Sequence, residues 1–152
     1  MSTKTDKPKV YLVEDDADDQ YMFKMLLKEL HIDIQLEIFN NGLAAYEALI
    51  TDLDQQEQSG INKLPGLILL DLNLPVWDGK KTLKRIKNHD ELKVVPVVIY
   101  TTSKSEYDRQ ECYVQGANSF ITKAAEFELL QSQIERIFSY WFEISIERKI
   151  SY

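Results

Sequence analysis

The chain has 152 residues and a mass of 17.7 kDa, which fits one domain of common size. Its formal charge of -7 argues against a nucleic-acid-binding surface, because such surfaces normally show a basic patch or stripe. The single cysteine excludes an internal disulfide, no apolar run approaches the ~18 residues of a membrane span, and no hydrophobic N-terminal stretch indicates secretion. We therefore expect a cytoplasmic, acidic domain with neither a nucleic-acid nor a membrane partner.

The first part of the chain predicts two strands and two helices. Residues 1–8 are polar and predict a flexible tail, and "KVYLV" is typical of a strand covered on both faces. Next, "YMFKMLLKELH" has apolar residues at helical spacing, with Asp18 or Asp19 as its expected cap. The run "IQLEIF" alternates like a strand with one exposed face, and a second helix follows "NNG". From Asp54 to Gly66 we expect a polar loop.

The rest of the chain predicts three more strands and three more helices. The strands are "LILLD", "VVPVVIYT" and "SFIT", with Pro96 near the start of the second. The helices are "DGKKTLKRIKNH", "SEYDRQECYVQGA", which Gly116 ends, and "EFELLQSQIERIFSYWFE". The apolar stripe of the last helix is expected to run from Phe127 to Trp141.

Five short strands that alternate with five helices predict an α/β fold. Helices on both faces of a five-stranded parallel sheet, with right-handed crossovers, favour a doubly wound sheet of order 2-1-3-4-5. This domain should cover residues 9–142, and no output domain is expected after the last helix. Residues 143–152 form an extension with three isoleucines, which either packs on its own domain or, as we favour, contributes to a dimer interface.

Polar side chains follow four of the predicted strands. Glu14 and Asp15 follow the first strand, Asp71 the third, Thr101 ends the fourth, and Lys123 follows the fifth. These strands are neighbours in the proposed order, so their carboxyl ends bring the five residues together. Two carboxylates ~4 Å apart repel by about 4 kcal/mol at an effective dielectric near 20, so a cation is expected, and an all-oxygen site suits Mg²⁺. A nearby hydroxyl and ammonium would hold a phosphoryl group, with the central carboxylate as its acceptor. The next acid, Asp16, is expected to be either an ordinary helix cap or a solvated bystander.

This set of residues, with the run "LLDLNLPVWDG", resembles the receiver domain of two-component response regulators over roughly residues 9–142. The resemblance implies a flavodoxin-like receiver fold, a histidine kinase as phosphoryl donor, and signalling through protein contacts by a protein that is not an enzyme. It implies that Asp71 is the phosphorylation site, that Asp15 binds Mg²⁺ directly, and that Glu14 binds it largely through water. The backbone carbonyl of Asn73 would complete the protein's metal ligands.

The same resemblance implies a role for residues of the fourth and fifth strands. Thr101 and Lys123 would contact the phosphoryl oxygens, and Thr101 would act with Phe120 as the switch. Phe120 lacks the hydroxyl of the tyrosine that many relatives have, so its two positions would differ in packing alone. Ala124 stands where receivers usually have a proline with a cis bond. A non-proline cis bond costs about 3 kcal/mol, so the state of the Lys123–Ala124 peptide stays open.

A narrower resemblance points to the kinase. The long loop before Pro65, the missing proline and the ending "FSYWFE" are similar to the small regulators that pair with cyanobacterial phytochrome kinases. This implies a phytochrome-type kinase as partner. Receivers often pair through their fourth helix, fifth strand and fifth helix, which implies a homodimer.

Two other functions are open. A Mg²⁺-dependent phosphohydrolase would also use an aspartyl nucleophile, but such enzymes have it on the first strand with a second acid two residues later. Here Asp71 follows the third predicted strand, and Asn73 is not an acid. A degenerate receiver that serves only as a binding module would lack some site residues, whereas all five are present and only Ala124 departs from the pattern.

Overall fold

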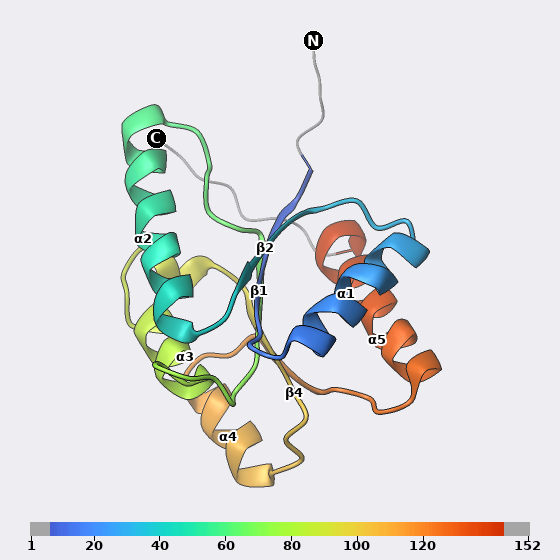
Figure 1. Cartoon of the computed structure of the whole chain (residues 1–152). Coiled ribbons are helices and arrows are strands. Elements are labelled where there is room, and N and C mark those ends of the chain that lie inside the picture. Colours follow the sequence, from blue (N-terminus) through green and yellow to red (C-terminus); the bar gives the residue numbers. More distant parts are fainter. Residues whose placement is uncertain (1–6, 145–152) are drawn as a thin grey trace.

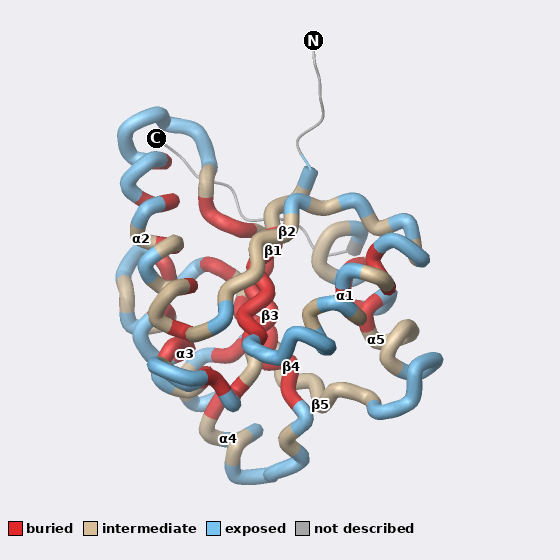
Figure 2. Tube along the Cα trace, in the orientation of Figure 1, coloured by how far each residue is buried: buried red, intermediate tan, exposed pale blue. Residues whose placement is uncertain are grey.

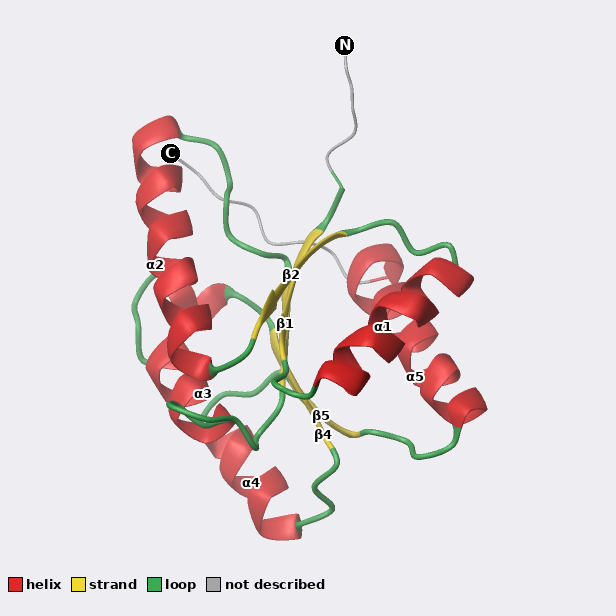
Figure 3. Cartoon of the chain, in the orientation of Figure 1, coloured by secondary structure: helices red, strands yellow, loops and turns green. Residues whose placement is uncertain are grey.

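A five-stranded parallel sheet forms the centre of the computed structural model, which describes residues 7–144. The strands pair in the order β2-β1-β3-β4-β5, and every neighbouring pair is parallel. Figure 3 shows the strands in yellow between the helices. Their bounds are β1 Lys9–Val13, β2 Gln35–Phe39, β3 Leu67–Leu70, β4 Val97–Thr101 and β5 Ser119–Thr122. The α/β class and the strand order predicted from the sequence are confirmed.

Five helices cover the two faces of the sheet, α1 and α5 on one and α2, α3 and α4 on the other (Figure 1). Their bounds are α1 Ala17–Glu29, α2 Gly42–Ser59, α3 Gly79–Lys87, α4 Glu106–Val114 and α5 Phe127–Ser139. A 3₁₀ turn, Leu92–Val94, precedes β4, and a π-helical turn, Tyr140–Ile144, follows α5. Within the described range, no helix is long and apolar enough to cross a membrane.

The central strands are buried on both faces (Figure 2). All four residues of β3 are buried, and they alternate between two cores: Ile68 and Leu70 face α2 to α4, whereas Leu67 and Leu69 face α1 and α5. This two-sided burial explains the uninterrupted apolar run that precedes Asp71. The strand is therefore a rigid support for the residue that follows it.

Helix α1 begins one turn earlier than its apolar stripe suggests. Asp16 is its N-cap, and its Oδ1 accepts the Asp19 N–H at 2.9 Å. The expected cap at Asp18 or Asp19 is wrong, since both lie in the first turn, and Asp16 is not a bystander. A run of acids has several possible caps, and the sequence alone does not select among them.

Helix α2 is longer than predicted. The segment expected to be a polar loop from Asp54 is helical as far as Ser59, and Gly60, with φ of 71°, ends it. Gln56 is buried, and its Oε1 accepts the Lys63 N–H at 2.9 Å, which ties the helix to the loop that follows. Polar residues such as Gln and Glu are good helix formers, so polarity alone did not mark a loop.

Phe127 is not part of the buried stripe of α5, because it is 45% exposed at the first position of that helix.

Candidate functional site

The carboxyl ends of β1 and β3 place two acids side by side. Val13 pairs with Leu70 in the sheet, so the residues that follow them, Glu14 and Asp71, leave the sheet at the same level. The Asp71 N–H donates to the Val13 carbonyl at 3.1 Å, which continues the pairing by one residue. The sheet register therefore brings together residues that lie far apart in the sequence.

Three carboxylates meet at this edge. Ligand atoms of Glu14, Asp15 and Asp71 lie within 4.8 Å of one another, and Asp15 is exposed whereas Glu14 is only 3% exposed. Glu14 Oε2 accepts the Asp16 N–H at 3.0 Å. Burial raises the pKa of Glu14 and the charge of Asp71 adds to this, while the hydrogen bond from Lys123 opposes it; the pKa remains above its ordinary value.

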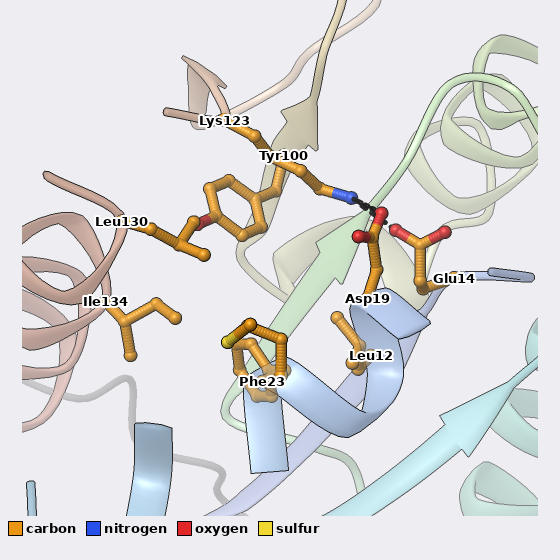
Figure 4. A pocket seen from close by; sticks show the side chains of 9 residues that line it. Leu12, Glu14, Asp19, Phe23, Tyr100, Lys123, Leu130 and Ile134 are labelled. Carbon is orange, nitrogen blue, oxygen red and sulfur yellow. Dashed lines mark hydrogen bonds and ion pairs between the residues drawn. The ribbon is translucent and has the colours of Figure 1, made fainter. Parts of the chain in front are cut away.

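Lys123 is the cation of the cluster (Figure 4). Its ammonium donates to Glu14, lies 3.4 Å from Asp19 Oδ2 and 3.7 Å from Asp71 Oδ2, and stands 5.5 Å above the Tyr100 ring. Burial lowers its pKa, but the Glu14 hydrogen bond and the three carboxylate charges outweigh burial and leave the pKa raised. Lys123 is therefore charged and held at the site by several groups.

Asp19 is a site residue that the sequence reasoning missed. We expected it to cap α1, whereas it lies in the first turn with its carboxylate toward Lys123 (Figure 4). No periodicity indicated this contact, because it depends on where α1 begins: with Asp16 as the N-cap, Asp19 lies in the first turn near Lys123.

The loop after Asp71 folds back onto that residue. Asp71 Oδ1 accepts the Leu72 N–H at 2.7 Å, and the Gly79 N–H donates to the Leu72 carbonyl at 2.9 Å. A Cβ at Gly79 would lie 2.2 Å from the Asp71 carbonyl oxygen, so only glycine lets α3 begin this close. Val76 in the same loop has φ of 66° and is exposed, which is a strained conformation for a β-branched residue. The run "LLDLNLPVWDG", which predicted the site, thus also supplies the close contact between Gly79 and the Asp71 backbone.

The remaining predicted residues, Thr101, Phe120 and Asn73, have different surroundings. Thr101 is fully buried, and its Oγ1 accepts the Ser103 N–H at 3.3 Å. Phe120 is half-buried against the core under α2 to α4. Asn73 is exposed and lines, together with Asp15, a groove of about 500 Å³ beside the cluster. The Lys123–Ala124 peptide is trans, as no described peptide bond is cis.

The charges of the site are unbalanced. Glu14, Asp15, Asp19 and Asp71 carry four carboxylates, and Lys123 provides one ammonium. In the described part of the chain, only Glu14, Asp15 and Asp71 form a group of acidic, histidine or cysteine side chains that could hold a metal ion. Its donors are all carboxylate oxygens, which suits a hard divalent cation. The residues present therefore fit a divalent metal.

The response regulator receiver domain model matches residues 10–135 of this chain. The chain belongs to the response regulator receiver family. The response regulator Rcp1 of Synechocystis sp. is 40% identical over 144 residues, which are 94% of this chain and 95% of Rcp1. Receivers of this family bind a divalent metal and accept phosphoryl groups from histidine kinases.

Two solved structures agree with the fold. The Mn²⁺-bound form of Rcp1 has a TM-score of 0.77 at 37% identity, with 93% of this chain and 99% of that chain covered. The phosphorylated cyanobacterial phytochrome response regulator RcpA has a TM-score of 0.81 at 32% identity, with 95% and 100% covered. The flavodoxin-like receiver fold predicted from the sequence is thereby confirmed.

Proposed function

We propose that this chain accepts a phosphoryl group from a histidine kinase on Asp71 and passes the signal on through protein contacts. The position of Asp71 carries the proposal, because its carboxylate lies within 4.8 Å of those of Glu14 and Asp15 and 3.7 Å from the ammonium of Lys123. It also directly follows β3, whose four residues are all buried, which holds it in a fixed place. The phosphohydrolase alternative has no comparable support, since the nucleophile would follow the third strand and Asn73 is not an acid.

The geometry suggests how the transfer proceeds. An Asp71 carboxylate oxygen attacks the phosphorus, the new O–P bond forms, and the P–N bond to the kinase histidine breaks with its electron pair left on nitrogen. Lys123, whose ammonium lies 3.7 Å from Asp71 Oδ2, would meet the phosphoryl oxygens, as would Thr101. Thr101 would have to leave its contact with the Ser103 N–H, which would displace the β4–α4 loop and allow Phe120 to change its packing.

We assign the metal as Mg²⁺. Asp15 and Asp71 would bind it directly, Glu14 largely through water, and Asn73 through its backbone carbonyl, and the ion would neutralise charge on the phosphoryl oxygens. Asp15 and Asn73 line the same groove, which leaves space for the donor. The Mn²⁺ form of Rcp1 supports a divalent ion but not the choice of Mg²⁺.

We infer that the kinase is phytochrome-type and that the protein acts in the cytoplasm as a homodimer. RcpA, 32% identical, is a phytochrome response regulator, which supports the first inference. Val114 on α4 and Leu129 on α5 are exposed apolar side chains, and they support a protein interface that involves these two helices. The proposed contribution of residues 143–152 to the dimer lies almost wholly outside the described residues.

Acetyl phosphate tests the proposal. With Mg²⁺, the intact mass of the wild-type protein should rise by one phosphoryl group, whereas Asp71→Asn should show no increase, because the nucleophilic carboxylate is gone. Asp90→Asn is the matched control, because it changes an exposed acid that is not part of the acidic cluster, and it should behave like wild type. Phosphoryl uptake by Asp71→Asn, or none by wild type with acetyl phosphate or a phytochrome-type kinase, would contradict the proposal.

A further inference from the structure

The side chain of Gln133 on α5 joins the peptide groups on both sides of Lys123. Its Oε1 accepts the Ala124 N–H at 3.0 Å, and its Nε2 donates to the Thr122 carbonyl at 2.9 Å. An exchange of the amide oxygen and nitrogen would set a donor against a donor, so the two partners determine the orientation of the amide. Lys123 therefore lies between two hydrogen bonds to one side chain.

These contacts extend the sheet at its edge. Strand β5 is the last strand, and the N–H of Lys123 points to β4, where it donates to the Thr101 carbonyl at 2.7 Å. Backbone groups alternate in direction along an extended chain, so the Thr122 carbonyl and the Ala124 N–H point away from β4. Beyond an edge strand such groups have no further strand to pair with. The Gln133 amide takes the place of a neighbouring strand for one residue.

Ala124 makes this arrangement possible. Proline has no N–H, so a proline at position 124 could not donate to Gln133. Where other receivers have a proline ring that restricts this loop, the present chain has a trans peptide and two hydrogen bonds with Gln133 of α5, one accepted and one donated by its amide. The departure from the family pattern thus coincides with a contact that proline would forbid.

We propose that Gln133 is a positioning residue, whose amide holds the Lys123 loop in place of the missing proline. The inference rests on the proposed function, since it concerns how Lys123 is presented to the phosphoryl group. The Lys123 side chain is 11% exposed and reaches both Glu14 and Asp71, so a shift of its backbone moves the ammonium away from both. Even a small displacement of the ammonium slows the reaction, because Lys123 must meet the charge that develops in the transition state.

The test compares two glutamines of α5. Gln133→Met keeps the length of the side chain and removes both hydrogen bonds. Asp71 phosphorylation by acetyl phosphate should then slow about tenfold, which corresponds to about 1.4 kcal/mol in the barrier. Gln131→Met makes the same change on the same helix at a half-buried position and should leave the rate unchanged. Gln133→Glu keeps the acceptor for Ala124 and loses the donor to Thr122, so its rate should lie between the two.

A second substitution separates positioning from general destabilisation. Ala124→Pro alone should slow phosphorylation, because it removes the N–H that Gln133 accepts. In the Gln133→Met background the same change should cause no further loss, since that hydrogen bond is already gone. Two unrelated destabilising changes would instead add. In Gln133→Met, hydrogen exchange at the Ala124 amide should also become faster, while the amide of Lys123 keeps its bond to Thr101.

Each result has one meaning. Equal rates for Gln133→Met and wild type, or additive losses in the double variant, would overturn the inference and leave the proposed function intact. Failure of the wild-type protein to take a phosphoryl group on Asp71 would overturn the proposed function and with it the role of Gln133 in the reaction. Unchanged Ala124 exchange in Gln133→Met would show that the amide does not hold the loop, whatever the phosphorylation result.

Discussion

Glu14 and Lys123 show, at the scale of single residues, how burial and pairing oppose each other in this site. Burial alone would favour neutral forms of both side chains, yet their contact and the surrounding carboxylates keep Lys123 protonated. A phosphoryl group on Asp71 would offer Lys123 a further anionic partner, bound to a carboxylate whose Oδ2 already lies 3.7 Å from the ammonium. Lys123 is therefore held near its proposed partner by a contact that it can exchange.

Cys112 on α4 shows burial without a partner. It is fully buried in the core between the sheet and α2 to α4, and burial raises the pKa of its thiol to about 11. A pKa of about 11 in place of about 9 lowers the thiolate fraction of Cys112 about 100-fold near neutral pH, and thiolate is the reactive form. At pH 8 a thiol reagent should therefore modify the native protein at least about 100-fold more slowly than the protein in denaturant. Similar rates in both states would mean that α4 leaves the thiol accessible.

The same shift determines how the thiol affects stability. The pKa of Cys112 is raised in the folded state. The contribution of the thiol to the free energy of unfolding is therefore full below the unfolded pKa of about 9 and is lost as pH rises toward 11. The free energy of unfolding should fall less steeply over this interval in Cys112→Ala than in wild type. Burial also raises the pKa of Tyr11 and Tyr100, but both remain in the two proteins, so the difference in slope isolates Cys112.

At the scale of elements, the sequence predicted what depends on apolar patterns. Strand β3 was evident because four consecutive apolar residues are required where helices cover both faces of a sheet. The end of α2 was not evident, since its last turns are polar and are joined to the next loop by Gln56. The contact of Gln133 with the Lys123 loop joins residues of two elements through a specific side-chain orientation, and no periodicity reports such a contact.

Helix α3 depends on Gly79 for its place beside β3. Alanine there should stabilise the helix by about 1 kcal/mol if helix propensity alone acted. Its Cβ would instead lie 2.2 Å from the Asp71 carbonyl oxygen, and overpacking of this kind costs about 1–3 kcal/mol. Gly79→Ala should therefore lower the free energy of unfolding in urea, and it should slow phosphorylation because α3 must move away from the Asp71 backbone.

Lys84→Ala is the matched control for that substitution, because Lys84 is exposed on the same helix. It should change stability by no more than about 0.5 kcal/mol. Equal or higher stability of Gly79→Ala would show that α3 can lie farther from β3 at no cost. The close approach seen at Gly79 would then have no bearing on the site.

On the scale of the whole molecule, the sheet gathers acids from distant segments at one edge. Glu14 and Asp15 come from the end of β1 and Asp71 from the end of β3, while the chain as a whole carries a net charge of -7. Their mutual repulsion opposes folding, because the carboxylates are dispersed in the unfolded chain. A bound divalent cation would attract these carboxylates, so that the cluster would favour folding. Stability should therefore depend on the metal in a way that single-residue substitutions can separate.

Mg²⁺ should stabilise the wild-type protein by about 2.7 kcal/mol at a concentration 100 times its dissociation constant. Asp15→Asn should lose most of that increment, since it removes an exposed carboxylate that would bind the metal directly. Without Mg²⁺ the same variant should be as stable as wild type or more so, because it relieves repulsion with Glu14 and Asp71. The two proteins should therefore change order in thermal unfolding when Mg²⁺ is added at constant ionic strength.

Asp18→Asn separates this effect from a general change of charge. It removes the same charge from the first turn of α1, but Asp18 is not part of the acidic cluster. Its melting temperature should rise with Mg²⁺ as much as that of wild type. If the melting temperature of Asp15→Asn also rose with Mg²⁺ as much as that of wild type, the ion would bind elsewhere. The repulsion among Glu14, Asp15 and Asp71 would then be relieved by Lys123 alone. Lys123 already pairs with Glu14 and contacts Asp71 at 3.7 Å, which leaves Asp15 as the acid most in need of a cation.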